Sequence, residues 1–327
     1  MIDLASSVTP LAFDAQTDLA RPIVIGLFQG SVYGLIALGI VLLYKSNRIF
    51  NFAQAEFGTL AALVTYLALN GKLFGIGWHM PYAVACLVGI VIGTLAAVLT
   101  ERLVVRPLFN RPKVILVVGT VGVLLLLIAV EGLFFTDLRN LPAINDPKQG
   151  ALKGLTGSAF KVPFAADYRV DWQQILVFVV LIALALASVA FFRYSRTGTA
   201  ILAVSQEPVA AEVVGISVGR ISLITWTIAG FLGAIAGVLV GPGVGGPGII
   251  APGAVTSATL ISGIAAAVLG GITSLPGAFV GGLLIGMMQA LAGANITGFP
   301  GSESVAVGVI LLLVLLIRPR GLLGKEA

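Results

Sequence analysis

The sequence predicts an all-α fold, a polytopic bundle of transmembrane helices, and three observations support this prediction. Of its 327 residues, 58% are hydrophobic and only 10% are charged, whereas a soluble domain carries about 25% charged residues. The apolar residues form runs that approach the roughly 20 residues needed to cross a bilayer. Glycine is abundant, at 41 residues, as expected where helices pack closely in lipid. This composition argues against a soluble enzyme, a DNA-binding protein and a disordered chain.

Nine apolar runs are candidate spans, and we expect them to form a single transmembrane domain over residues 1–327. Six approach full length: Ile23–Tyr44, Phe52–Leu69, Pro81–Thr100, Val114–Phe135, Ile175–Phe192 and Ile221–Gly241. Three are shorter: Thr259–Thr273, Gly277–Ala292 and Ser304–Ile317. The first two short runs are either spans or a re-entrant pair broken at Ser274–Pro276, because a break in lipid must be buried in protein. We therefore expect seven full spans with a re-entrant pair, or nine spans.

The basic residues gather in loops on one side of the predicted bundle. Twelve of the 19 Lys and Arg residues belong to this group: Lys45, Arg48, Arg102, Arg106, Arg111, Lys113, Arg193, Arg196, Arg220, Arg318, Arg320 and Lys325. By the positive-inside rule these loops face the cytoplasm. The rule predicts an outside N-terminus and a cytoplasmic C-terminus. Basic residues scattered through short loops in this way do not indicate a nucleic-acid partner.

Two connections are long enough to carry function. Residues 136–174 are polar and are predicted outside, where they form either a small cap that meets a soluble partner or a plain connecting loop. Residues 193–220 are predicted to be cytoplasmic. Within them, Pro208 suits the first position of a helix and Gly215 suits its stop, so Pro208–Val214 is predicted to be a short helix.

This short helix would have an apolar edge. Val209 and Val213 form an apolar i,i+4 pair, and Glu207 complements the helix dipole. The edge suits a groove on a soluble partner, or else the membrane surface.

Glycines recur four residues apart on predicted spans. Gly26, Gly30 and Gly34 share one face of the first span, and Gly233 and Gly237 share a face of the sixth. We assign these residues to close helix packing, although some of the faces could instead slide apart to open a path.

Polar side chains within the apolar runs are rare. Gln29, Asn51, Gln54 and Glu56 are the candidates for a translocation pathway, because ionisable groups in lipid usually face the bundle interior or water. Glu56 could instead lie at the interface near Lys45 and Arg48. Glu131 lies near the outer end of its run and is expected at the interface.

The sequence offers little for catalysis. It has one cysteine, Cys86, and one histidine, His79, so we expect no disulfide, metal site or hydrolytic triad. Gly324–Lys325 is followed by Glu326, and no phosphate-binding loop is present. We therefore expect no enzyme activity in this chain, and any ATP that drives it must be hydrolysed by another subunit.

Four stretches resemble the permease subunit of branched-chain amino acid ABC importers, the LivH-type family. They are residues 26–62, 196–216, 266–286 and 311–324, and the first contains an N-F-A-x-x-E-F core at Asn51–Phe57. One departure is Gln54–Ala55, where the family often has His-Gly. The second stretch is similar to the segment that docks on the ATPase. The resemblance therefore implies these coupling residues: Glu207, Pro208, Val209, Ala211, Glu212, Val213 and Gly215.

The resemblance implies an ABC importer permease fold in a bacterial inner membrane. It also implies that a periplasmic binding protein delivers branched-chain or related amino acids to this chain, which pairs with a second, related permease. Two cytoplasmic ATPase subunits would hold the ATP and Mg, and this chain would hold no cofactor. The alternatives are a stand-alone secondary transporter or channel for a small polar solute, or urea or short amides as the solute.

Overall fold

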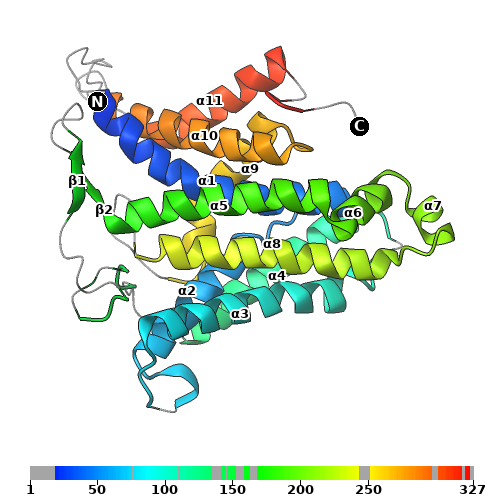
Figure 1. Ribbon diagram of the computed structural model, residues 1–327, viewed down its shortest axis with the longest axis horizontal. Helices are drawn as coiled ribbons and strands as arrows, with labels where there is room; N and C mark the ends of the chain where they lie inside the picture. Colours follow the sequence, from blue (N-terminus) through cyan, green and yellow to red (C-terminus); the bar gives the residue numbers. More distant parts are fainter. Residues whose placement is uncertain are drawn as a thin grey trace, which may run out of the picture.

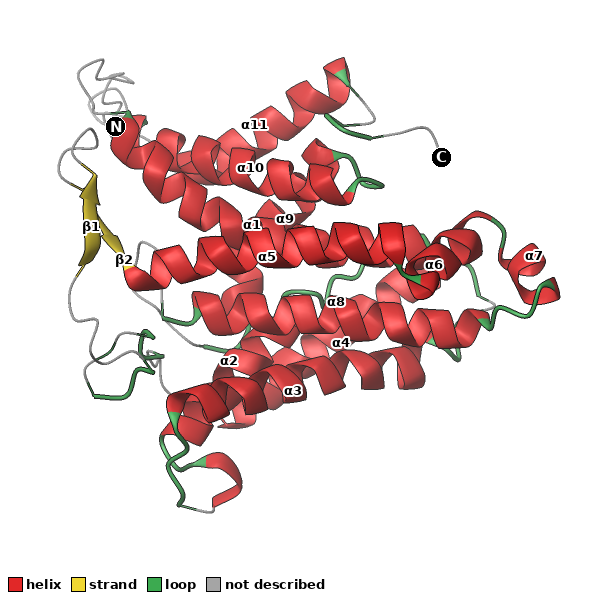
Figure 2. Cartoon of the chain, viewed as in Figure 1, coloured by secondary structure: helices red, strands yellow, loops and turns green. Residues whose placement is uncertain are grey.

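The computed structural model describes residues 19–75, 77–109, 111–134, 141–144, 146, 148–151, 158–162, 168–242, 251–296, 301–318 and 321–324. Figure 1 shows long helices that run roughly along one axis, with the start of α1 and the end of α11 toward opposite ends of the bundle. Figure 2 shows that, apart from one hairpin, the described elements are helices joined by loops and turns. The predicted all-α class is confirmed.

In the part of the chain that the structure describes, six helical segments are long and apolar enough to cross a membrane. They are α1 (Ala20–Asn47), α3 (Tyr82–Thr100) continued by the π-helical turn η2 (Glu101–Val105), α4 (Lys113–Phe134), α5 (Trp172–Tyr194), α8 (Val218–Val240) and α10 (Leu275–Asn295). The shorter elements are α2 (Glu56–Leu69), η1 (Leu73–Gly75), α6 (Arg196–Gln206), α7 (Pro208–Val213), α9 (Ala254–Gly270) and α11 (Ser302–Ile317). This is the arrangement of a polytopic membrane protein.

Helix α1 forms the centre of the bundle. It packs against α5, α8, α9 and α10, and its residues from Leu35 to Leu43 are almost completely buried. The outer helices instead expose large apolar side chains, such as Leu87 on α3, Leu125 on α4 and Leu312 on α11. Because water would penalise such faces, they are the surface that lipid covers.

The two ends of the bundle differ in charge. At one end, here called the basic end, a pocket of about 430 Å³ is lined by Lys45, Arg48, Arg193, Ser274 and Leu323. The C-terminal segment is attached there, because the backbone N–H groups of Leu322 and Leu323 donate to carbonyls at the end of α9, at 2.7 and 3.0 Å. Three residues of the predicted basic side, Lys45, Arg48 and Arg193, therefore meet at this end, while Arg320 and Lys325 lie outside the described residues.

The opposite end carries a β-hairpin within the long predicted outer loop. Strand β1 (Ser158–Val162) pairs antiparallel with β2 (Tyr168–Asp171), in the register Val162 to Tyr168, with an irregularity between Ser158 and Phe160. Val162 and Val170 pack against Phe28 of α1. Asp171 and Gln174 form a capping box that starts α5. The described part of residues 136–174 is thus a packed hairpin rather than a featureless connection.

The second predicted span is wrong at its start. We expected Phe52–Leu69, but α2 begins at Glu56 and has 14 residues, about 21 Å at 1.5 Å per residue. Arg48 has a left-handed backbone at the C-cap of α1, and residues 49–55 continue without regular structure. Ala53 and Ala55 in this segment are fully buried, as irregular backbone within a membrane must be.

Helices α9 and α10 are joined by a turn at the basic end. Ser274 caps α10 by accepting a hydrogen bond from the Gly277 N–H at 3.1 Å. Because α10 has 21 residues and runs along the bundle (Figure 1), the structure favours a span over a re-entrant segment here. Helix α9 has 17 residues and begins at Gly253 with a left-handed cap, so it resembles α2 in being a short helix within the bundle.

The glycine-rich faces bring helix backbones together. A Cβ atom at Gly26 would lie 2.5 Å from the Met287 Cα, and one at Gly30 would lie 2.6 Å from the Gly282 carbonyl oxygen. Gly233 and Gly237 of α8 similarly meet the backbone at Gln54 and Gly58. Gly34 differs, since its nearest neighbour is the Leu181 side chain of α5. Close backbone approach gains dispersion contacts that lipid cannot supply.

Candidate functional site

The first candidate site is a buried pair of carboxyl groups between the two short helices. Glu56 lies in the first turn of α2, and Glu131 lies on α4; both side chains are fully buried. The N-terminal turn of α9 contacts both carboxyls. Its Thr256 hydroxyl donates to Glu56 Oε2, and its Gly253 N–H donates to Glu131 Oε2 at 3.3 Å. The two carboxyl groups also interact with each other.

Asn51 and Gln54 hold the irregular segment in place. The Asn51 Nδ2 donates to Gln54 Oε1 at 3.3 Å, and Asn51 Oδ1 accepts from the Ala53 N–H at 3.0 Å. Gln54 Nε2 in turn donates to the Ala229 carbonyl of α8 at 2.8 Å. The Asn51 amide thus satisfies an N–H of the irregular segment, and the Gln54 amide attaches the segment to α8. Both residues therefore support the segment that leads into Glu56.

The fourth predicted pathway residue, Gln29, lies apart from this centre. It is half-buried on α1, next to Phe28, which packs against the hairpin. The structure thus brings together three of the four candidates, with Asn51 and Gln54 supporting the backbone and Glu56 in the carboxyl pair.

The expectation that Glu131 lies at the interface is wrong. Its neighbours on α4, including Leu125, Leu126 and Leu133, face outward, whereas Glu131 is buried. It shares the inward face with Leu116, Thr120 and Val123, at the i, i+4, i+7 and i+15 positions of one helical stripe. That spacing is visible in the sequence and could have placed Glu131 inward. No sequence pattern linked Thr256 and Gly253 to the carboxyl pair, because the start of α9 comes close to α2 only in the folded protein.

The second candidate site is α7, which lies beyond the basic end of the bundle (Figure 1). It begins with Pro208 in its first turn and ends at Val213, close to the predicted Pro208–Val214. Its valines face away from the protein: Val209, Val213 and Val214 are 68%, 82% and 74% exposed. Three exposed valines on so short a segment form an apolar edge that is separate from the long outer helices.

Some of the seven predicted coupling residues are exposed on this apolar edge, and others hold α7 in place. Ala211 is only 4% exposed, so it faces inward, whereas Glu207 and Glu212 are exposed beside the valines. Gly215 has a φ of +87°, a left-handed conformation that other residues adopt only with strain. Helix α6, which sequence reasoning missed, precedes α7; the Ser195 hydroxyl caps it by accepting from the Gly198 N–H at 2.8 Å.

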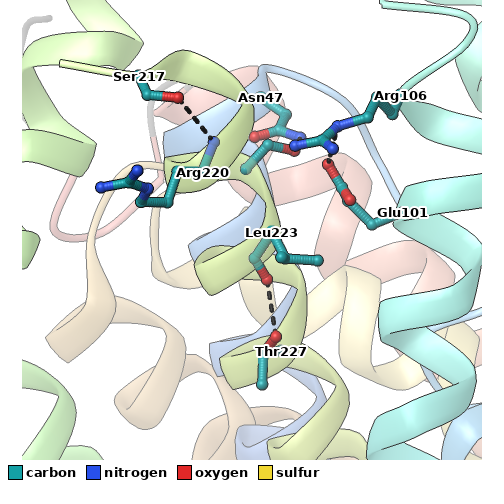
Figure 3. A network of polar contacts seen from close by, with 8 residues as sticks. Asn47, Glu101, Arg106, Ser217, Arg220, Leu223 and Thr227 are labelled. Atoms are coloured by element: carbon teal, nitrogen blue, oxygen red, sulfur yellow. Dashed lines mark hydrogen bonds and ion pairs between the residues drawn. The ribbon is translucent and has the colours of Figure 1, made fainter. Parts of the chain in front are cut away.

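Polar contacts join the start of α8, the helix that follows α7, to the other long helices. Helix α8 starts at the cap residue Ser217. Shortly after this cap, Ser222 accepts a hydrogen bond from Asn47 Nδ2 of α1 at 3.1 Å. Figure 3 shows Arg106 and Glu101 pointing toward each other beside this contact, with Arg106 Nε 3.9 Å from Glu101 Oε1.

The Arg106–Glu101 pair depends on the π-helical turn η2. The Arg106 N–H donates to the Glu101 carbonyl at 2.7 Å, the i→i−5 bond that defines such a turn. Arg106 also covers Gly219, where a Cβ atom would lie 2.9 Å from its guanidinium. The start of α8 is therefore in contact with both η2 and α1.

We expect Arg106→Ala to destabilise the protein by about 1–3 kcal/mol, because it removes the cation that forms an ion pair with the buried Glu101 carboxyl. The thermal unfolding midpoint of the purified protein in detergent measures the loss. Adding Glu101→Gln should restore most of it, since a neutral amide needs no counter-charge. Arg111→Ala, which removes an exposed cation shortly after the same turn, is the matched control; an equal loss in both single variants would contradict the pairing.

Among the described residues, no group of three His, Cys, Asp or Glu side chains could hold a metal ion. The fold defines a polytopic helical membrane protein of the permease class. A family model described as "Branched-chain amino acid transport system / permease component" matches residues 23–317. The chain belongs to this family, whose members are permease components of ABC transport systems in the inner membrane.

Curated relatives match along nearly the whole chain. The high-affinity branched-chain amino acid transport system permease protein LivH of Escherichia coli K12 is 30% identical over 305 residues, 92% of this chain and 94% of LivH. The corresponding BraD protein of Pseudomonas aeruginosa is 32% identical over 317 residues, 93% of this chain and 95% of BraD. The xylose/arabinose import permease protein XylH of Sulfolobus acidocaldarius is 26% identical over 293 residues, 86% of this chain and 73% of XylH.

Proposed function

We propose that this chain is the membrane subunit of an ATP-driven importer that passes branched-chain or related amino acids into the cytoplasm. The observation that carries the proposal is the exposed valine edge of α7, which lies outside the lipid-facing bundle at the basic end. An apolar edge on a short helix suits a groove on a soluble protein. The names of LivH and BraD supply the solute class.

In this proposal the basic end faces the cytoplasm, since basic loops favour that side. Two ATPase subunits bind there, one on α7 of this chain and one on a second, related permease. They hold the ATP and Mg, and this chain contributes no catalytic group or cofactor. A periplasmic binding protein delivers the solute at the opposite end, where the β-hairpin lies.

The geometry suggests how ATP binding would reach the bundle. When the ATPases close, they displace α7, and the start of α8 moves with it. The contacts from Ser222 to Asn47 and from Arg106 to Glu101 then shift α1 and η2. Such a step drives transport only if these contacts differ in free energy between the inward-open and outward-open states.

Uptake by reconstituted proteoliposomes tests the proposal. We expect radiolabelled leucine to accumulate when the permease pair, the ATPases, the loaded binding protein and ATP are all present. Omitting the ATPases should abolish uptake, whatever proton or sodium gradient is imposed. Uptake driven by an ion gradient without ATPase subunits would instead show a secondary transporter and would contradict the proposal.

A further inference from the structure

The carboxyl pair has acceptor oxygens that the protein does not use. One oxygen of each group is held at the start of α9: Glu131 Oε2 by the Gly253 N–H, and Glu56 Oε2 by Thr256. The other oxygen of each, Oε1, is buried and accepts no hydrogen bond from the described residues. The protein thus fixes the orientation of both carboxyls and supplies no hydrogen-bond donor to one oxygen of each.

Thr59 adds a third oxygen of the same kind. The hydroxyls of Thr65 and Thr225 follow the usual helical pattern and donate to the carbonyl four residues earlier, at 2.8 and 2.9 Å. Thr59 is fully buried, yet its Oγ1 has no partner among the described residues. It lies three residues after Glu56 on α2, and therefore on the same face of that helix.

The charge of this centre is not balanced by the protein. The ion pair recorded among the described residues joins Arg106 to Glu101, and no described Lys, Arg or His side chain pairs with Glu56 or Glu131. Removing a carboxylate from water without a partner costs several kcal/mol. Ionisable groups kept at such depth in a membrane protein usually mark the path of a solute or an ion.

We propose that Glu56, Glu131 and Thr59 form a transient binding site for the primary ammonium group of the solute as it crosses the bundle. An ammonium group donates three hydrogen bonds and accepts none, and the centre offers three buried oxygens that receive no hydrogen bond from the described residues, two of them on acidic side chains. The inference rests on the proposed function, since it requires a solute that carries an amino group. Asn51 and Gln54 have a supporting role, because they fix the backbone that precedes Glu56.

Two variants of Glu131 test the site in the complete complex, with the ATPases, the loaded binding protein and radiolabelled leucine. Glu131→Gln should lower uptake about tenfold or more, a loss of roughly 1.4 kcal/mol or greater. The stimulation of ATP hydrolysis by the binding protein should stay within about twofold of the unchanged complex, because α7 and its contacts are intact. Glu303→Gln, which neutralises an exposed carboxyl at the start of α11, should leave uptake unchanged.

Glu131→Lys separates a binding role from a structural one. It places a tethered ammonium beside Glu56, which balances the charge, so the unfolding midpoint should equal or exceed that of the unchanged complex. Uptake should nevertheless be abolished, because the site is permanently occupied. If Glu56 and Glu131 had only a structural role, the lysine would form an ion pair with Glu56 that keeps the structure intact, and uptake would continue.

The outcomes distinguish the two proposals. Normal uptake by both Glu131→Gln and Glu131→Lys would overturn the ammonium site and leave the ATP-driven importer standing. ATP-driven import of an uncharged amide, without import of leucine, would also overturn the site alone. Absence of any ATP-driven import by the unchanged complex would overturn the proposed function and this inference with it.

Discussion

A complex that carries Val209→Glu and Val213→Glu on α7 is expected to lose its ATPase subunits. Both valines are largely exposed, at 68% and 82%, so the substitutions do not disturb packing within this chain. A carboxylate buried in an apolar interface has no partner and costs several kcal/mol, enough for a drop of about tenfold or more in affinity. Co-purification of the ATPases with the tagged permease in mild detergent measures the effect.

The matched control replaces the same two valines by isoleucine, which keeps the edge apolar and should preserve ATPase binding. Substitution at Ala211 is a poorer test, because that residue is 4% exposed and a charge there would disturb the support of α7. Gly215 is similarly unsuitable, since its positive φ strains any other side chain. Normal co-purification of the double glutamate variant would exclude α7 as the docking element.

Gly30→Leu is expected to prevent stable assembly of the bundle. The Cβ atom alone would lie 2.6 Å from the Gly282 carbonyl oxygen and 2.8 Å from the Leu283 Cα. Both are backbone atoms, so α1 and α10 must separate along the face where they pack. Overpacking of a tight core costs about 1–3 kcal/mol, and a displaced central helix raises that cost. Membrane yield and the unfolding midpoint in detergent report the loss.

Gly122→Leu on α4 is the control, because a Cβ atom there meets nothing within 4 Å. The two variants add the same apolar volume to a membrane helix and differ only in what faces the new side chain. Equal yields and equal unfolding midpoints would show that the α1–α10 contact does not limit stability.

The sequence predicted most accurately those features that depend on residues close together in the chain. The long spans, the all-α class and the short helix at Pro208 followed from runs of apolar residues and from proline and glycine at helix ends. The spacing of Gly26 and Gly30 predicted a packing face, and both residues meet the backbone of α10. Such signals are local, so one sequence is sufficient to find them.

Predictions from the sequence were least accurate for features formed by contacts between segments that are far apart in the chain. The run at Phe52–Leu69 did not reveal an irregular stretch. Asn51 accepts a hydrogen bond from its Ala53 N–H, and Gln54 attaches it to α8, and neither contact can be inferred from an apolar run. Glu131 was misplaced because its position along α4 suggested the membrane surface, while its helical face decided its burial. Thr256 became visible only once the start of α9 was seen to contact Glu56.

The central claim is that this membrane subunit relies on separate ATPase subunits, which act on it through α7. A cross-linker attached at Val213→Cys tests it most directly, in a background where the single native cysteine is removed by Cys86→Ala. In the actively importing complex we predict a covalent adduct with an ATPase subunit, and a yield that changes when ATP is added. An adduct with the periplasmic binding protein, or no protein adduct in a complex that still imports solute, would contradict the account.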